Sequence, residues 1–212
     1  MTKDLQKGLE AALKLAPVVP VMVIDNVKDA VPLARALVRG GLPVLEITLR
    51  TETAVESIRA IVAEVEGAIV GSGTVLTPQQ LRDSRKAGCT FAVSPGSTGK
   101  LLGAAEDEDI ALLPGGVTAS ECMALLEWGY TIQKFFPAEP AGGAPYLASL
   151  ASPLPHIKFC PTGGITPALA PSYLKLSNVI TVGGSWMIPK ALIAAGDWAG
   201  IEKLASEAAT LK

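Results

Sequence analysis

The sequence predicts an α/β fold, namely a (β/α)8 TIM barrel with an extra helix at its N-terminus. Short runs rich in valine and isoleucine recur at fairly even intervals, and segments with helical periodicity separate them. The runs are continuously apolar, which is typical of parallel strands that are buried on both faces. A doubly wound α/β sheet is the alternative, but eight roughly equal units within 212 residues favour the barrel.

The eight apolar runs are the predicted strands. They cover residues 18–24, 44–49, 69–75, 91–94, 111–114, 131–136, 157–160 and 178–182. Pro20 interrupts the first run, and because proline cannot donate a hydrogen bond to a ladder, we expect a bulge at this position.

Helical periodicity is clearest in three segments between these runs, at residues 27–40, 53–67 and 77–88. The last of them begins with Thr77-Pro78 and stops at Gly88, which are typical start and stop residues of a helix. Residues 1–16 are also helical in pattern, and we expect this helix to cap the bottom of the barrel. No linker or shift in composition marks a second domain, so residues 1–212 are expected to form one domain.

Composition disfavours several classes of partner. With 18 basic and 20 acidic residues, the net charge of −2 gives no basic surface for nucleic acid or an anionic membrane. The three cysteines are widely spaced and form no CxxC pair, which is typical of a reducing compartment. The N-terminus lacks the apolar core of a signal peptide, and no segment reaches the ~18 apolar residues of a membrane span. We therefore expect a cytoplasmic protein.

Charged side chains interrupt two of the predicted strands. Lys134 lies in the sixth strand, and Glu46 and Arg50 lie in and just after the second. Residues two or four apart in a strand share one face, so we expect Glu46 and Arg50 to point the same way. In a parallel barrel that face is the interior, and the chemistry gathers at the carboxyl ends of the strands. We expect the three side chains to meet there.

Each of these residues has a structural and a chemical interpretation. A lone lysine in a strand most simply extends its amine to water, but enclosure beside a cation favours a neutral amine, which can attack a carbonyl and form a Schiff base. Glu46 is either the ion-pair partner of a cation or a general acid/base. The planar fork of Arg50 suits a substrate carboxylate.

Two glycine pairs follow the seventh and eighth predicted strands, in "PTGGI" (161–165) and "VGGSW" (182–186). The loops after these strands are the usual phosphate site of a (β/α)8 barrel, and paired glycines let backbone N–H groups approach an anion. A metal-dependent mechanism is disfavoured, because the sequence has no HExxH, histidine cluster or dense carboxylate group. The single histidine, His156, precedes the seventh strand and should lie at the opposite end. Cys160 is expected in the core.

The sequence contains six motifs in this order: "EITLR", "GSGTVL", "FAVSPG", "KFFPA", "CPTGGI" and "GGSW". Together they closely resemble the 2-keto-3-deoxy-6-phosphogluconate (KDPG) aldolase family, which includes the 4-hydroxy-2-oxoglutarate aldolases. The likeness runs from residue 16 to about residue 186. Two departures are Gln133, where an apolar or aromatic residue is common, and a more glycine-rich "PGGVTAS", whose Gly116 leaves the end of the fifth strand less defined.

The resemblance implies a metal-free class I aldolase that assembles as a homotrimer and uses no cofactor beyond a covalent lysine imine. Lys134 matches the Schiff-base lysine of the family and Glu46 its general acid/base. Arg50 and Thr74 match the positions of the family that bind the pyruvyl carboxylate, and Pro95 lies beside them. Phe136 matches the aromatic residue near the lysine. The positions that hold the hydroxyls and the phosphate match Thr162, Gly163, Gly164, Gly184 and Ser185.

The reaction implied is the reversible cleavage of KDPG to pyruvate and D-glyceraldehyde 3-phosphate, a step of the Entner–Doudoroff pathway. Two alternatives keep the chemistry and change the substrate, to 4-hydroxy-2-oxoglutarate (giving pyruvate and glyoxylate) or to the galactonate epimer of KDPG. The glycine loops and Ser185 favour a phosphate. An interpretation of another class is a barrel that binds a sugar phosphate for isomerisation or without catalysis, and it predicts that Lys134→Met keeps turnover or ligand affinity.

Overall fold

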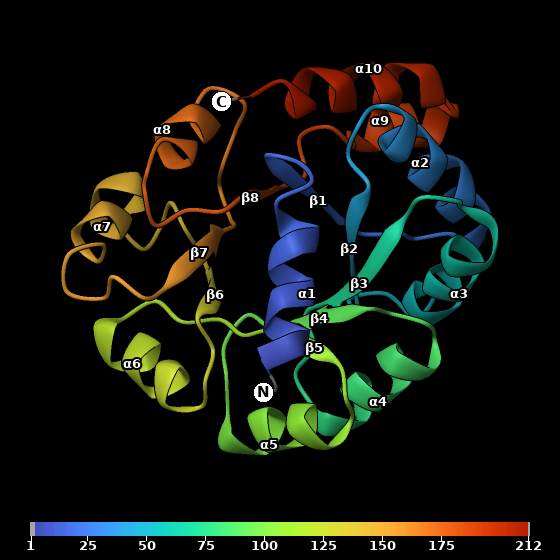
Figure 1. Cartoon of the computed structure of the whole chain (residues 1–212). Helices are drawn as coiled ribbons and strands as arrows, with labels where there is room; N and C mark the ends of the chain where they lie inside the picture. The colour runs from blue at the N-terminus through green and yellow to red at the C-terminus, as the bar shows by residue number, and fades with distance from the viewer. Residues whose placement is uncertain (1–2, 212) are drawn as a thin grey trace.

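The computed structural model describes residues 3–211, in which eight strands alternate with helices after an initial helix (Figure 1). The strands are β1 (Val18–Met22), β2 (Val44–Thr48), β3 (Ile69–Gly73), β4 (Phe91–Val93), β5 (Ala111–Leu113), β6 (Ile132–Phe135), β7 (Lys158–Pro161) and β8 (Val182–Gly184). The helices are α1 (Lys3–Leu13), α2 (Val27–Arg39), α3 (Ala54–Glu64), α4 (Pro78–Lys86), α5 (Gly99–Asp107), α6 (Ala119–Glu127), α7 (Gly143–Ser149), α8 (Ala170–Leu174), α9 (Lys190–Ala195) and α10 (Trp198–Ala209).

All strand pairs are parallel, and they form two sheets. Six strands pair in the order β5-β4-β3-β2-β1-β8, and β6 pairs with β7. Between the two sheets the backbone pairing is limited to isolated bridges, such as Gly115 with Lys134 and Thr162 with Gly183. In Figure 1 the strands curl around a centre and helices α2–α10 surround them. The predicted α/β class is therefore confirmed, with a curled parallel sheet.

The predicted boundaries of the first seven strands agree with the structure to within two residues, whereas the eighth is misplaced. It was expected at residues 178–182, but β8 is Val182–Gly184, and Val179 makes only an isolated bridge to Phe159. The reason is a close approach. A Cβ atom at Gly183 would lie 2.2 Å from Oγ1 of Thr162, so the strand needs glycine where a sequence pattern expects apolar side chains.

Pro20 does not break β1. Residues 18–20 pair with β8, and residues 21–22 pair with β2. The missing N–H of Pro20 thus coincides with the place where β1 changes its pairing partner, and the strand runs on from Val18 to Met22 without ending there. The expected bulge is replaced by this change of partner.

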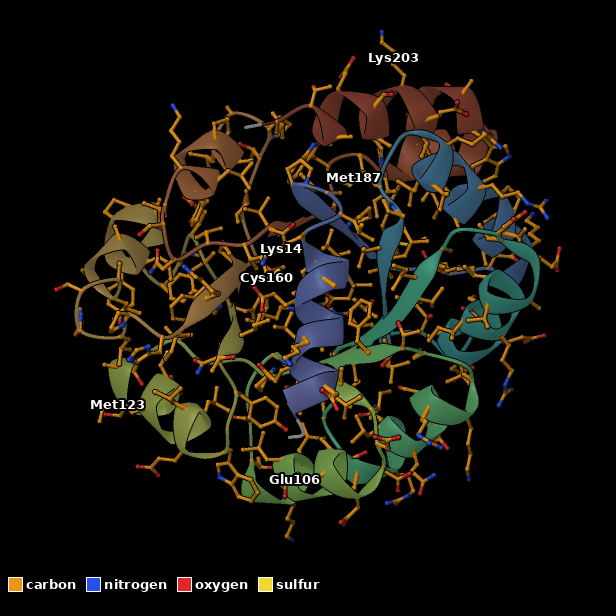
Figure 2. All side chains as sticks on the ribbon, viewed as in Figure 1. Lys14, Glu106, Met123, Cys160, Met187 and Lys203 are labelled. Atoms are coloured by element: carbon orange, nitrogen blue, oxygen red, sulfur yellow. The ribbon has the colours of Figure 1, made fainter. Side chains whose placement is uncertain are left out.

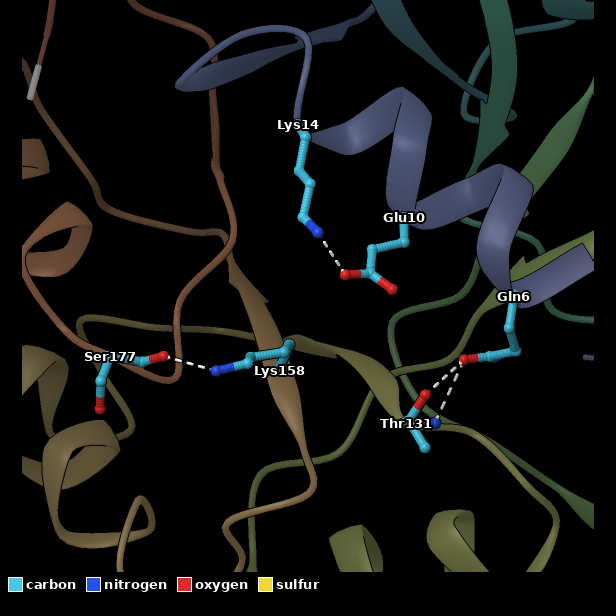
Figure 3. A network of polar contacts seen from close by, with 6 residues as sticks. All are labelled: Gln6, Glu10, Lys14, Thr131, Lys158 and Ser177. Carbon is cyan, nitrogen blue, oxygen red and sulfur yellow. Dashed lines mark hydrogen bonds and ion pairs between the residues drawn. The ribbon is translucent and has the colours of Figure 1, made fainter.

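Helix α1 covers the end of the strands at which they begin (Figure 1). Leu9 and Leu13 are buried in a cluster with residues of several strands, including Phe91 of β4. Oε1 of Gln6 accepts hydrogen bonds from the backbone N–H and the hydroxyl of Thr131, at 3.3 and 2.8 Å, just before β6 (Figure 3). Helix α1 therefore lies across this end of the ring of strands.

Helix α4 begins and ends where its sequence predicts. The side chain of Thr77 accepts a hydrogen bond from the backbone N–H of Gln80, and Pro78 is the first helical residue. The chain leaves the helix at Gly88, whose φ of +97° favours glycine. None of the described helices is long and apolar enough to cross a membrane.

Candidate active site

Lys134 and Glu46 meet in the interior of the sheets. Nζ of Lys134, on β6, donates a hydrogen bond to Oε1 of Glu46, on β2, at 3.1 Å. Each side chain exposes only 4% of its surface, so the pair is an ion pair withdrawn from water. Burial of either charge without the other would be strongly unfavourable. The predicted meeting of these two residues is confirmed.

Hydrogen bonds on both sides of β6 fix the backbone of Lys134. Its N–H donates to the carbonyl of Pro114 at 2.8 Å, and its carbonyl accepts from the N–H of Gly116 at 2.9 Å. On the other side it pairs in register with Cys160 of β7. Gly116 thus continues the backbone pairing beyond β5. Because the backbone of Lys134 is hydrogen-bonded on both sides, the position of its side chain is well defined.

The space for Glu46 comes from Gly73, the last residue of β3. A Cβ atom at Gly73 would lie 2.3 Å from Oε1 of Glu46 and 2.7 Å from its Cγ. Real side chains do not approach so closely, so any other residue at this position has to displace the carboxylate.

Cys160 is the neighbour of Lys134 on β7. Figure 2 shows it near the centre of the ring of strands, whereas Met123 and Lys203 lie at the periphery. Burial raises the pKa of the Cys160 thiol to about 12, with a further increase from the charge of Glu46. The thiol is therefore protonated at neutral pH and does not compete with the amine as a nucleophile. The expectation that it belongs to the core is confirmed.

Phe136 follows β6 directly, and the centroid of its ring lies 5.2 Å from Nζ of Lys134. This distance is within the range of a cation–π contact. The predicted aromatic neighbour of the lysine is in place.

Arg50 lies at the rim and not inside. Strand β2 ends at Thr48, so the two-residue alternation does not extend to Arg50, which is exposed. The expectation that Arg50 shares the enclosed interior with Glu46 was wrong for this reason. Nε of Arg50 donates to Oγ1 of Thr74 at 3.0 Å. Thr74 has a φ of +57°, an uncommon conformation for a residue other than glycine and one that clusters at functional sites.

A cavity of about 130 Å³ opens beside this rim. It brings together Arg50 and Phe136 with both glycine loops, and it is lined by Val21, Arg50, Phe136, Thr162, Gly163, Gly164, Ile165, Gly183, Gly184 and Ser185. Val21, Ile165 and Gly183 were not predicted; the last two belong to the quoted glycine motifs, whereas no sequence signal marks Val21. Thr74 and Pro95 follow β3 and β4 and do not belong to the lining of this cavity.

The glycine loops line the cavity with backbone. Gly163 and Gly164 have φ angles of +105° and +81°, which side chains rarely adopt. Thr162, which precedes them, is buried, and its Oγ1 is the atom that Gly183 leaves room for. Consecutive N–H groups in such a loop are suited to an anion.

His156 precedes β7 and is exposed. Within residues 3–211, no group of three or more histidine, cysteine, aspartate and glutamate side chains is placed to hold a metal ion.

The sequence has close relatives. A family model described as KDPG and KHG aldolase matches residues 9–204. The "KHG/KDPG aldolase" of Escherichia coli (strain K12) is 51% identical over 206 residues, which are 97% of each chain. The "2-dehydro-3-deoxy-phosphogluconate aldolase" of Dickeya dadantii (strain 3937) is 50% identical, again over 97% of each chain.

Solved structures of similar sequence are also aldolases, and they superpose on this chain. The 2-keto-3-deoxy-6-phosphogluconate aldolase of Zymomonas mobilis ZM4, crystallised with 3-phosphoglycerate, is 48% identical and superposes with a TM-score of 0.92 over 98% of this chain and 97% of that one. KDPG aldolase from Legionella pneumophila, with pyruvate captured as a covalent carbinolamine, is 43% identical with a TM-score of 0.92 over 95% and 98% of the two chains. The resemblance of the six motifs is thus confirmed, and the chain belongs to the KDPG and KHG aldolase family.

Proposed function

We propose that this protein is a class I, Schiff-base aldolase that reversibly cleaves KDPG to pyruvate and D-glyceraldehyde 3-phosphate. The observation that carries the proposal is the buried Nζ of Lys134, 3.1 Å from a buried carboxylate and beside the ring of Phe136, which lines the cavity. The names of the relatives, and the covalent pyruvate adduct of the Legionella enzyme, support it.

The first half of the reaction uses Lys134 as the nucleophile. Glu46 is within hydrogen-bonding distance of Nζ, so it can take the proton that the ammonium must lose. The neutral amine attacks the C2 ketone of the substrate to give a carbinolamine. Glu46 returns its proton to the carbinolamine hydroxyl, which leaves as water, so the iminium ion forms and Glu46 is ionised again.

The second half breaks the C3–C4 bond. Glu46, directly or through a water, accepts the proton of the C4 hydroxyl as the bond electrons move toward the iminium nitrogen. The aldehyde leaves, the enamine is protonated at C3, and hydrolysis of the iminium releases pyruvate and Lys134. Because the iminium is itself the electron sink, we propose that the reaction needs neither a metal ion nor another cofactor.

The two ends of the substrate would bind at different places, one at the rim beside Arg50 and the other in the cavity lined by the glycine loops. Arg50 and Thr74, with Pro95 nearby, are proposed to bind the pyruvyl carboxylate, and a guanidinium that uses Nε for Thr74 has further N–H donors for a carboxylate. The hydroxyls and the phosphate are assigned to Thr162, Gly163, Gly164, Gly184 and Ser185, where the loop backbone lines the cavity.

Borohydride trapping tests the Schiff base directly. Reduction in the presence of pyruvate should add one adduct to the intact mass, and peptide mapping should place it on Lys134. An unchanged mass, or an adduct on another lysine, would contradict the proposal.

A second substrate is supported by the names of several relatives. The Escherichia coli protein is named for both KHG and KDPG, so we propose 4-hydroxy-2-oxoglutarate as a further substrate of this site. A KDPGal structure is a weaker guide, at 27% identity and a TM-score of 0.77. Values of kcat/KM for the three substrates decide the order, and a preference for the unphosphorylated one would overturn the ranking.

Gly73→Ala should remove most of the activity because its Cβ would displace the carboxylate of Glu46. A shift of about 1 Å at a reacting group can cost about 10²-fold in rate, and we expect kcat to fall by that order. Steady-state cleavage of KDPG measures it. Gly8→Ala in α1 is the matched control, since its Cβ would meet nothing within 4 Å, and it should leave kcat unchanged.

We also propose that the strands close into a (β/α)8 barrel that forms one domain, as the isolated bridges Gly115–Lys134, Phe159–Val179 and Thr162–Gly183 support. The homotrimer implied by the family resemblance is a further proposal, for which light scattering measures the mass in solution.

The three cysteines are buried and free, which supports a reducing, cytoplasmic location.

A further inference from the structure

The first glycine loop rests on the segment that follows Lys134. The N–H of Ala138 donates to the carbonyl of Thr162 at 2.8 Å, and the N–H of Glu139 donates to the carbonyl of Gly163 at 3.0 Å. A Cβ atom at Gly164 would lie 2.8 Å from Cβ and 2.9 Å from Cγ of Glu139. The Gly163–Gly164 backbone is therefore held by the backbone of Ala138 and Glu139 and packs against the aliphatic part of the Glu139 side chain.

Tyr173 holds the other end of that side chain. It lies in α8, the helix that follows the glycine loop, and it is fully buried. Its hydroxyl donates a hydrogen bond to Oε1 of Glu139. Burial, with the hydrogen bond to Glu139, raises the pKa of the Tyr173 hydroxyl, so this group stays protonated and remains a donor at neutral pH.

The charge of Glu139 matters because the glycine loop is suited to an anion. Neither Glu139 nor Tyr173 is among the residues that line the cavity. The carboxylate nevertheless belongs to a side chain in contact with Gly164, so a rotation that released it could bring a negative charge toward a bound anion. Two like charges repel over several ångströms, and salt weakens that repulsion.

We propose that Glu139 and Tyr173 are positioning residues for the distal anionic group of the substrate. The stem of Glu139 fixes Gly164, and the hydroxyl of Tyr173 keeps the carboxylate turned away from the cavity. Neither side chain touches the substrate in this proposal, and both act through the Gly163–Gly164 backbone. The proposal rests on the proposed aldolase function for its choice of substrate.

Tyr173→Phe tests the pair, because it keeps the buried ring and removes only the donor. We expect KM for KDPG to rise about tenfold with kcat within about twofold, and the rise should be larger at low ionic strength. The exchange of pyruvate C3 protons with solvent should be unchanged, because pyruvate has no distal group. Tyr146→Phe is the matched control; its hydroxyl donates to the carbonyl of Val117 at 3.2 Å, and its loss should leave KM unchanged.

Glu139→Gln in the Tyr173→Phe background separates charge from packing. Without the carboxylate, the additional salt dependence of KM that Tyr173→Phe introduces should disappear, and KM should return close to that of Glu139→Gln alone. A KM for Tyr173→Phe equal to that of the unmodified protein would overturn the proposal. So would equal losses in KDPG cleavage and in pyruvate exchange, since these would indicate only a general loss of structure.

Binding of 3-phosphoglycerate, measured by calorimetry, tests the pair without turnover. Tyr173→Phe should weaken binding about tenfold at low salt, and Tyr146→Phe should not. If the unmodified protein fails to exchange pyruvate protons, the aldolase proposal fails, while this affinity still decides the role of Glu139 and Tyr173. Unchanged affinity in Tyr173→Phe would contradict that role.

Discussion

Lys134→Met is expected to lower kcat/KM for KDPG by at least about 10⁴-fold, because the substitution removes the atom that forms the covalent bond to the substrate. The methionine side chain is apolar and similar in length, so it fits the enclosed site, although it leaves Glu46 without its cationic partner. Steady-state kinetics measure the loss, and borohydride with pyruvate should no longer add mass to the protein.

Lys158→Met provides the matched control. Lys158 lies on the neighbouring strand β7, is exposed, and donates to the backbone carbonyl of Ser177 at 2.7 Å, at the end of the strands that α1 covers (Figure 3). The same substitution there should leave kcat/KM and the trapped adduct unchanged. Turnover that survives in Lys134→Met would support a phosphate-binding barrel with different chemistry, and the aldolase mechanism would have to be abandoned.

Glu46→Gln is expected to lower kcat for KDPG cleavage by about 10²–10⁴-fold. The amide has nearly the shape of the carboxylate and its Oε1 can still accept the hydrogen bond from Lys134, but it cannot take the proton of the C4 hydroxyl. The covalent adduct with pyruvate should still form, though more slowly, because Lys134 remains. Rapid-quench kinetics with borohydride separate the two steps.

Glu64→Gln is a suitable control for this change. Glu64 is an exposed acid whose carboxylate lies 3.7 Å from Arg35, so the same loss of charge occurs far from the sheet interior. It should leave kcat unchanged. If Glu46→Gln cleaved KDPG at the rate of the unmodified protein, another group would have to be the base.

The central pair could be predicted from the sequence because its signal is local. Lys134 and Glu46 are charges within continuously apolar strands, and strand alternation alone places both on the interior face. A buried charge needs a partner, so each residue identifies the other. The glycine loops could be predicted for a similar reason, since their order after the last two strands coincides with a known feature of barrels.

Other features depend on packing that no local pattern encodes. The place of β8 follows from contact between Gly183 and Thr162, and the tolerance of Pro20 follows from a change of pairing partner. Arg50 was expected inside because β2 was extended beyond Thr48. The contact of Glu139 with Tyr173 joins the turn after β6 to helix α8, and neither residue breaks an apolar pattern.

Helix α1 covers one end of the ring of strands, so we expect the site to be reached from the opposite end. Leu9 and Leu13 pack against the end at which the strands begin, so we expect substrate and both products to pass the rim formed by the loops at the other end. Under the proposed reaction, the fragment held by the glycine loops lies nearer that rim than the fragment bound to Lys134. The aldehyde departs first and pyruvate last, because pyruvate stays covalently bound to Lys134 until the iminium is hydrolysed, and its inner position lets the aldehyde leave without passing it.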